Sequence, residues 1–244
     1  MILTQPDMFH GMTKDELSIE LVKAYEPSEG YVVAYSGGKD SDATIDIMER
    51  SGSKYEAEYY VSPIDPPELM QHIRDNHPEV KWVYNARGRW GMVAKRGLPR
   101  RQSRWCCEVI KESGGIGRIV VTGSRSGESG GRSGQKCFSK FKNQDKQILR
   151  PINNWSTAEV WEYIRKRNLS YCKLYDEGFE RLGCVMCPLA SHKNRMYEME
   201  RFPKIAANWK RACGRIVARR LASGKVYKKP FATEDELWDW WKSL

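Results

Sequence analysis

The sequence predicts an α/β protein in which a doubly wound, mostly parallel sheet is followed by a helical C-terminal region. Three observations lead to this prediction. Short apolar runs alternate with helix-like segments in the first half of the chain, and a glycine pair separates the first run from the next helical segment. Beyond Pro151, apolar residues recur at helical spacing. We therefore expect two domains, residues 1–150 and residues 151–244.

The first domain contains repeated strand–helix units. A capping box from Thr13 to Glu16 predicts an opening helix. Strands that alternate with helices imply a parallel sheet joined by right-handed crossovers, with helices on both faces. The expected strands are residues 31–35, 57–61, 80–84 and 118–122, and the expected helices are residues 42–50, 66–76 and 103–113.

Residues 123–147 are rich in Ser, Gly, Lys and Arg and have no apolar periodicity, so they predict a long loop. This loop follows the last expected strand. Because ligands of open α/β sheets bind at the carboxyl ends of strands, the loop should lie beside the glycine pair. The second domain begins with a capping box from Ser156 to Glu159, and another starts at Thr233. Its C-terminal tryptophans are expected to pack in the core.

Composition limits the classes of protein and partner. A chain of 244 residues with 40% hydrophobic content can bury a core. The sequence has no apolar run of about 20 residues and no signal-peptide pattern, which predicts a cytoplasmic protein without membrane contact. A formal charge of +10 indicates anionic partners. A nucleotide in a cleft, a nucleic acid across a face and a merely solvated basic surface all remain open.

The glycine pair belongs to a hexapeptide, Ser-Gly-Gly-Lys-Asp-Ser, between the first strand and its helix. Glycines there let backbone N–H groups point at a phosphate, and the helix N-terminus adds its positive end. A simple turn is the alternative, and a Walker A loop is excluded by the spacing. The candidate phosphate-binding residues are Ser36, Gly37, Gly38, Lys39, Asp40 and Ser41.

Seven cysteines form the second pattern, and their odd number is unlike a disulfide framework. An adjacent pair, Cys106 and Cys107, precedes a long insert and a Cys-x-x-Cys formed by Cys184 and Cys187. Four thiolates can hold a zinc ion or a [4Fe–4S] cluster. Adjacent cysteines suit one small ion poorly, because their side chains point apart, whereas a larger cluster tolerates adjacency better; the cluster, zinc and free thiols all stay open on spacing alone.

The hexapeptide resembles the signature of the PP-loop ATP pyrophosphatases, and further segments resemble their phosphoadenosine phosphosulfate (PAPS) reductase branch. Together these segments span residues 30–190. They are Asp65-Pro66-Pro67-Glu68, Arg104-Trp105-Cys106-Cys107, Thr122-Gly123 with Arg125 and Glu128, Pro151-Ile152 with Trp155 and Trp161, and Gly183-Cys184-Val185-Met186-Cys187-Pro188.

The resemblance implies a sheet similar to the adenine nucleotide α-hydrolases, with a PP-loop nucleotide-binding domain at residues 1–150 and the Cys-x-x-Cys in the C-terminal region. It implies an adenine nucleotide on residues 36–41, with Asp65 also in the binding site and Lys39 and Asp40 catalytic, and it leaves room for Mg²⁺. Arg125 would clamp phosphate or sulfate, since its fork suits bidentate oxyanion contact, or would be a solvated loop arginine. The cysteine pattern is similar to the cluster-binding pattern of adenylylsulfate reductases.

The sequence departs from the family at the nucleophile. Family reductases carry a C-terminal Glu-Cys-Gly-x-x-His segment, and this chain offers only Cys213 before Gly214. The basic residues Lys210, Arg211 and Arg215 could lower the Cys213 pKa, but a cysteine at helical spacing is more often packed than reactive. Cys137 in the basic loop is a second candidate thiol, as a sulfur carrier.

Three functions therefore compete. The first is an oxidoreductase that converts adenylylsulfate or PAPS to sulfite with a thioredoxin-like reductant. The second is an ATP-using transferase that delivers sulfur from a donor to a nucleic acid. The basic segments at residues 96–104 and 211–220 favour this one slightly, and the missing nucleophile segment disfavours the first. The third is a nonenzymatic nucleotide- or nucleic-acid-binding module, disfavoured by the complete loop and four cysteines.

Overall fold

The computed structural model describes residues 3, 5–6, 11–86, 88–128, 130–141, 144–224 and 229–244. Its contacts divide the chain into two compact units. We call residues 1–60, 67–83 and 114–182 the sheet unit, and residues 61–66, 84–113 and 183–244 the helical unit. Each unit is described by itself.

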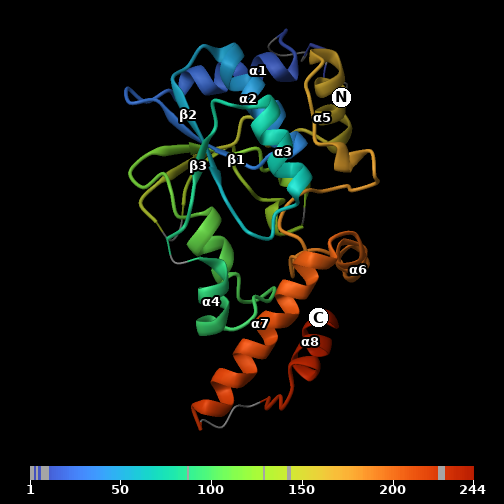
Figure 1. Cartoon of the computed structure of the whole chain (residues 1–244). Coiled ribbons are helices and arrows are strands. Elements are labelled where there is room, and N and C mark those ends of the chain that lie inside the picture. The colour runs from blue at the N-terminus through green and yellow to red at the C-terminus, as the bar shows by residue number, and fades with distance from the viewer. Residues whose placement is uncertain are drawn as a thin grey trace. The chain divides into compact units, whose positions relative to one another are not determined.

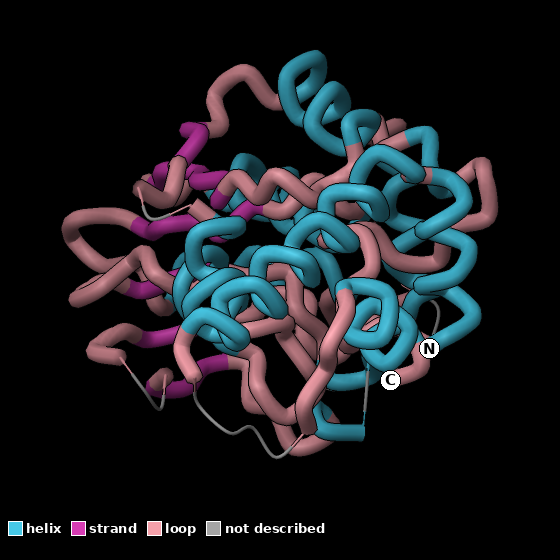
Figure 2. Tube along the Cα trace, turned by 60° about the horizontal axis from the view of Figure 1, so that its bottom comes forward, coloured by secondary structure: helices cyan, strands magenta, loops and turns pink. Residues whose placement is uncertain are grey.

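The sheet unit contains a six-stranded sheet in the order β3-β2-β1-β4-β6-β5. All neighbouring strands are parallel except β5 and β6, which are antiparallel. Figure 2 shows these strands as magenta segments. The elements of this unit are α1 (Lys14–Ala24), β1 (Tyr31–Tyr35), α2 (Lys39–Ser51), β2 (Tyr55–Tyr60), α3 (Pro67–Asn76), β3 (Lys81–Val83), β4 (Ile119–Val121), the 3₁₀ turns η2 (Ser126–Glu128) and η3 (Gly130–Arg132), β5 (Phe138–Lys140), β6 (Gln147–Leu149), α5 (Thr157–Arg167) and the 3₁₀ turn η4 (Lys173–Tyr175).

Burial of apolar side chains explains the order of the central strands. Val32 of β1, Val120 of β4 and Ile148 of β6 are buried together, and Ala34 and Phe141 pack against them. Helix α2 contacts β1 and also packs against α1 and α5 (Figure 1). A parallel sheet covered in this way favours continuous apolar strands, which the sequence has.

The helical unit is built around a tryptophan core. The ring centroids of Trp209 on α7 and Trp241 on α8 lie 4.8 Å apart, and those of Trp209 and Trp90 on α4 lie 5.1 Å apart. Trp209 and Trp241 are fully buried, so the expected core role of the C-terminal tryptophans is confirmed for this pair. The elements of this unit are α4 (Arg89–Arg96), the π-helix η1 (Cys107–Lys111), α6 (His192–Arg201), α7 (Pro203–Ala222) and α8 (Glu234–Lys242).

The structure confirms the α/β class and differs from the expected elements in several places, among them helix α4 and strand β6, which were not expected. A π-helix of five residues replaces most of the helix expected at residues 103–113. Part of the expected loop forms the antiparallel strand β5, which pairs with β6 and completes the sheet edge. The contact-based units also differ from a division at residue 150, because α5 packs on α2 and belongs with the sheet.

Among the helices in the described part of the chain, none combines the length and apolar character needed to cross a bilayer.

Candidate functional site

The loop between β1 and α2 is shaped by its two glycines. Gly37 has φ +72°, and a Cβ there would lie 2.8 Å from Leu69 and 2.9 Å from Ile73 on α3, so only glycine fits. Gly38 is the N-cap of α2 in an extended conformation. The positive end of the α2 dipole is therefore directed at the space beside Gly38, where a phosphate can bind without meeting a Cβ.

Two buried cations converge on the carboxylate of Asp40. Lys39 Nζ lies 3.0 Å from Asp40 Oδ2, and Arg125 Nε lies 2.5 Å from Asp40 Oδ1. Arg125 also donates to the backbone oxygen of Trp155 at 3.0 Å and to Thr157 Oγ1 at 3.3 Å. Arg125 is thus a fixed part of the site rather than a solvated loop arginine.

The expected approach of the 123–147 segment to the glycine loop is confirmed. A Cβ on Gly123 would lie 2.6 Å from the backbone oxygen of Asp40, so the chain after β4 passes directly against the start of α2. The hydroxyls of Ser36 and Ser41 lie 3.2 Å apart, and Ser41 donates to the Gly38 oxygen at 2.7 Å. All six residues of the hexapeptide and Arg125 therefore belong to one local structure.

Tyr175 is a residue of this loop structure that the sequence analysis missed. Its hydroxyl accepts a hydrogen bond from the Lys39 backbone N–H at 3.1 Å, and Lys39 Nζ lies 5.3 Å from the centre of its ring. Burial raises the pKa of Tyr175 above its usual range. The hydroxyl therefore stays protonated and can donate to an anion at the α2 N-terminus. No spacing signal links it to Lys39, which is 136 residues away.

Asp40→Ala is expected to lower the free energy of unfolding by about 2–3 kcal/mol. The substitution leaves the buried Arg125 charge without its carboxylate, and an orphaned buried charge is costly. Urea denaturation measures the loss. Glu20→Ala removes an exposed ion pair with Lys23 and should change stability by less than about 0.5 kcal/mol. Equal effects of the two variants would contradict this role of Asp40.

The four candidate metal-binding cysteines all lie in the helical unit. Cys107 opens the π-helix η1, a type of helix that is rare and often found at functional sites. Cys184 and Cys187 lie in a turn closed by a hydrogen bond of 3.2 Å from the Cys187 N–H to the Cys184 oxygen. Between them, Met186 adopts φ +58° and donates its N–H to Glu198 at 2.5 Å, which holds the turn on α6.

Basic side chains surround these cysteines. Arg89 is buried and donates to Cys184 Sγ at 3.5 Å, and its Nε has no hydrogen-bond partner among the described residues. A hydrogen bond from Cys106 and then the Arg104 guanidinium lower the pKa of Cys107 to about 5, although burial opposes this. Burial raises the pKa of Cys184 to about 11. Such surroundings suit a group that brings negative charge to the thiolates.

The cysteine spacing tests the choice of metal. Four thiolates on one zinc ion, each about 2.3 Å from the metal, would lie about 3.8 Å from one another. All four cysteines are described, yet no three of their Sγ atoms lie within 4.8 Å of each other. The thiols of Cys106 and Cys107 do interact, so adjacency does not force them apart as expected. The donor set and the unpartnered Arg89 Nε fit an anionic multi-iron group better than a single zinc ion.

Asp65, which the resemblance assigns to the nucleotide site, lies in the same unit as the four cysteines. Asp65 is buried in the helical unit, and Lys111 Nζ of η1 lies 3.3 Å from its Oδ1. The neighbouring Ile64 oxygen accepts from the Val185 N–H at 2.8 Å, which ties this segment to the Cys-x-x-Cys turn. The described contacts therefore connect Asp65 to the cysteine group.

Cys213 is a core residue and not an accessible thiolate. It is fully buried on α7, and burial raises its pKa to about 12. The expectation that Cys213 acts as a catalytic nucleophile is therefore corrected, because helical spacing turns it into the unit's interior. Cys137, the second candidate thiol, is partly buried just before β5.

A parallel sheet with a glycine loop between its first strand and a helix N-terminus defines a nucleotide-binding α/β protein. Within this class, residues 30–190 match the family model of the phosphoadenosine phosphosulfate reductase domain. The chain belongs to the PAPS reductase family.

Three known proteins show what the chain is similar to. It is 30% identical to an uncharacterised protein of Methanocaldococcus jannaschii, over 86% of this chain and 45% of the relative. It is 25% identical to an adenosine 5'-phosphosulfate reductase of Bacillus cereus, over 72% of this chain and 81% of the relative. It shares the fold of the Candida glabrata FMN adenylyltransferase bound to FAD and inorganic pyrophosphate, with a TM-score of 0.54 and 17% identity over 77% and 72% of the two chains.

The first two curated relatives, both from Methanocaldococcus jannaschii, are longer proteins, and the chain spans 45% and 53% of their lengths.

Proposed function

We propose that this PAPS-reductase-family chain is an enzyme that binds an adenine nucleotide on residues 36–41 and carries out sulfur chemistry with a [4Fe–4S] cluster. The observation that carries the proposal is the α2 N-terminus, where the glycine loop precedes the helix and Lys39 and Arg125 both pair with Asp40. The similarity to an adenosine 5'-phosphosulfate reductase supports both the nucleotide and the sulfur chemistry.

Each residue of the loop has a distinct task in this proposal. The backbone N–H of Gly38 and the Tyr175 hydroxyl bind phosphate oxygens, and Lys39 Nζ and the Arg125 guanidinium neutralise their charge. Asp40 holds both cations in place before the nucleotide arrives. Because the donors are fixed in advance, they favour charge that develops on the phosphate in the transition state.

The proposed cluster ligands are Cys106, Cys107, Cys184 and Cys187. Bound there, the cluster would supply iron and sulfide for the sulfur chemistry. Arg89, Arg104 and Lys111 balance its negative charge, and the π-helix and the Met186 turn orient the two cysteine pairs.

Burial of Cys213 favours transfer over reduction. A reductase needs a thiolate that attacks the sulfur of the sulfonucleotide and expels AMP from adenylylsulfate or adenosine 3',5'-bisphosphate from PAPS, and Cys213 is fully buried on α7. In a transferase, an acceptor oxygen attacks the α-phosphorus of ATP and pyrophosphate leaves. Sulfide from a donor then replaces the adenylate, and AMP leaves. The acceptor we propose is a nucleic acid, because the chain carries ten excess positive charges.

A paired assay distinguishes the two reactions. Protein with its cluster loaded is incubated with adenylylsulfate or PAPS plus a dithiol, and separately with ATP plus mixed RNA and DNA. We expect pyrophosphate release that depends on nucleic acid and falls steeply with salt, since neutralised phosphates release counterions. Cys213→Ser should leave this activity unchanged. Rapid sulfite formation that is lost in Cys213→Ser would restore the reductase function and contradict the transferase.

A further inference from the structure

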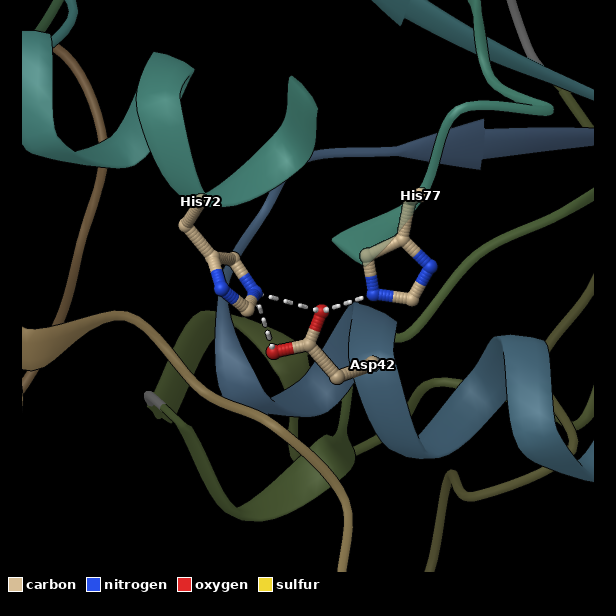
Figure 3. Close-up of side chains that lie close together, drawn as sticks. All are labelled: Asp42, His72 and His77. Carbon is tan, nitrogen blue, oxygen red and sulfur yellow. Dashed lines mark hydrogen bonds and ion pairs between the residues drawn. The ribbon is translucent and has the colours of Figure 1, made fainter. Parts of the chain in front are cut away.

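A second cluster of metal-ligating side chains lies in the sheet unit, away from the cysteines in sequence. It consists of Asp42 in the first turn of α2, His72 on α3 and His77 just after α3, and all three side chains point toward one another (Figure 3). One ligand atom from each lies within 4.8 Å of the others, and no other such group occurs in the described ranges. The glycine loop and the cysteine group use none of these residues.

The distances within this cluster are long for hydrogen bonds. His72 Nε2 lies 3.4 Å from both carboxylate oxygens of Asp42, and His77 Nε2 lies 3.5 Å from Asp42 Oδ1. Good N–H···O bonds are about 2.7–3.2 Å long. Two ligands of a tetrahedral zinc ion, each about 2.0–2.1 Å from the metal, lie about 3.4 Å apart. The spacing is therefore that of ligands around a shared ion.

Glu79 orients the ring of His77. Its Oε1 lies 3.2 Å from His77 Nδ1, and in the tautomer whose Nδ1–H donates to Glu79, Nε2 directs its lone pair at the Asp42 carboxylate. Two acceptors facing each other need a cation between them, which is either a proton or a metal ion. A carboxylate, a histidine and a metal in series is a recurrent arrangement at zinc sites.

Burial makes an unneutralised charge on the Asp42 carboxylate costly. Asp42 is 2% exposed, and its Oδ2 has no hydrogen-bond partner among the described residues. Its Oδ1 accepts from the Tyr35 hydroxyl at 2.5 Å, which orients the carboxylate toward the histidines. Asn76 lies 3.1 Å from His72 Nδ1 and can turn either its NH₂ or its carbonyl toward that nitrogen, so it can support either tautomer.

An acidic cavity gives an ion access to this cluster. The cavity has a volume of about 240 Å³, and Asp42 and His77 line it together with Asp46, Glu49 and Glu79. Burial, and then the negative charges of Asp46 and Glu79, raise the pKa of Glu49. The cavity therefore attracts cations and has room for a water molecule as a fourth ligand.

We propose that Asp42, His72 and His77 bind one divalent transition-metal ion, with Zn²⁺ as the best fit, independently of the cysteine-bound group. The ion joins the first turn of α2 to α3, directly after the glycine loop in the chain. Zinc is favoured because it accepts two imidazoles, one carboxylate and a water in tetrahedral geometry. The site is separate from the proposed function and does not depend on it.

The test measures zinc binding to the full chain after chelator treatment. Calorimetric titration with ZnCl₂ and metal analysis should give one zinc per chain more in the wild type than in His77→Ala. The zinc X-ray absorption spectrum should show nitrogen and oxygen ligands. His72→Gln should weaken binding at least 100-fold, and His192→Ala, which changes an exposed histidine, should bind as the wild type does.

Thermal unfolding provides a readout that does not depend on stoichiometry. Excess zinc should raise the Tm of the wild type and of His192→Ala but not that of His77→Ala, because only a folded site binds the ion. Equal zinc content in the wild type and His77→Ala would overturn the proposal and leave a proton between His77 and Asp42. Zinc with sulfur ligands alone would also overturn it, by assigning all the metal to the cysteines.

Discussion

Gly38→Val is expected to lower adenine-nucleotide affinity at least about 100-fold while leaving the fold intact. Gly38 has φ −93°, which any residue adopts, so the backbone tolerates a side chain. A Cβ there would lie 3.3 Å from the Tyr175 hydroxyl and 3.8 Å from Ser36 Oγ, inside the position proposed for the phosphate. A 100-fold loss corresponds to about 2.7 kcal/mol, which is reasonable for a blocked phosphate site. Calorimetry with ATP, adenylylsulfate and PAPS measures it.

Two further variants identify the cause of this loss. Gly134→Val changes a glycine of the 123–147 segment that has open space around it. The nucleotide affinity of this variant should match that of the wild type. Gly38→Ala combined with Tyr175→Phe removes the crowding between the new Cβ and the hydroxyl. If the double variant recovers full affinity, the Cβ displaces Tyr175 and not a phosphate, and the loop assignment fails.

Cys184→Ala is expected to remove all iron and acid-labile sulfide from anaerobically prepared protein, which should otherwise be brown. Thiolate ligation holds such clusters, so a variant that lacks one of the four proposed ligands is expected to lose the cluster. Iron and sulfide analysis together with the visible spectrum measures the loss. The expected change is from about four irons per chain to near zero.

Cys172→Ser is the matched control for the cluster. Cys172 is as buried as a core residue and belongs to the sheet unit, so its substitution should leave the iron content unchanged. Stoichiometric zinc without iron in the wild type would contradict the cluster.

The sequence predicted the sheet well because its signals are local. The apolar run at β1 and the glycine stop at Gly52 each mark an element within a few residues, and β1 matches its expected bounds. The π-helix η1 was missed because its i→i+5 bonding leaves no sequence period distinct from an α-helix. Strand β5 was missed because three residues, Phe-Ser-Lys, are too short to show alternation.

The site was predicted where residues adjacent in sequence act together, and not where distant residues meet. The position of the hexapeptide and the approach of the 123–147 segment to it follow from the strand–loop–helix pattern and from the rule for strand ends. The hydroxyl of Tyr175 and the histidines around Asp42 come from other elements, and only tertiary packing brings them in.

The helical unit is built from three separate stretches of the chain. This affects the order in which the chain can fold during synthesis. The sheet unit is complete once Leu182 has been made, whereas residues 61–66 and 84–113 need partners from residues 183–244. The ribosome therefore releases Cys106 and Cys107 long before Cys184 and Cys187 exist, and the first pair waits as exposed thiols through the synthesis of the intervening chain. The proposed cluster can therefore be loaded only after residues 184–187 have been made, whereas the residues of the proposed Asp42–His72–His77 site are present much earlier.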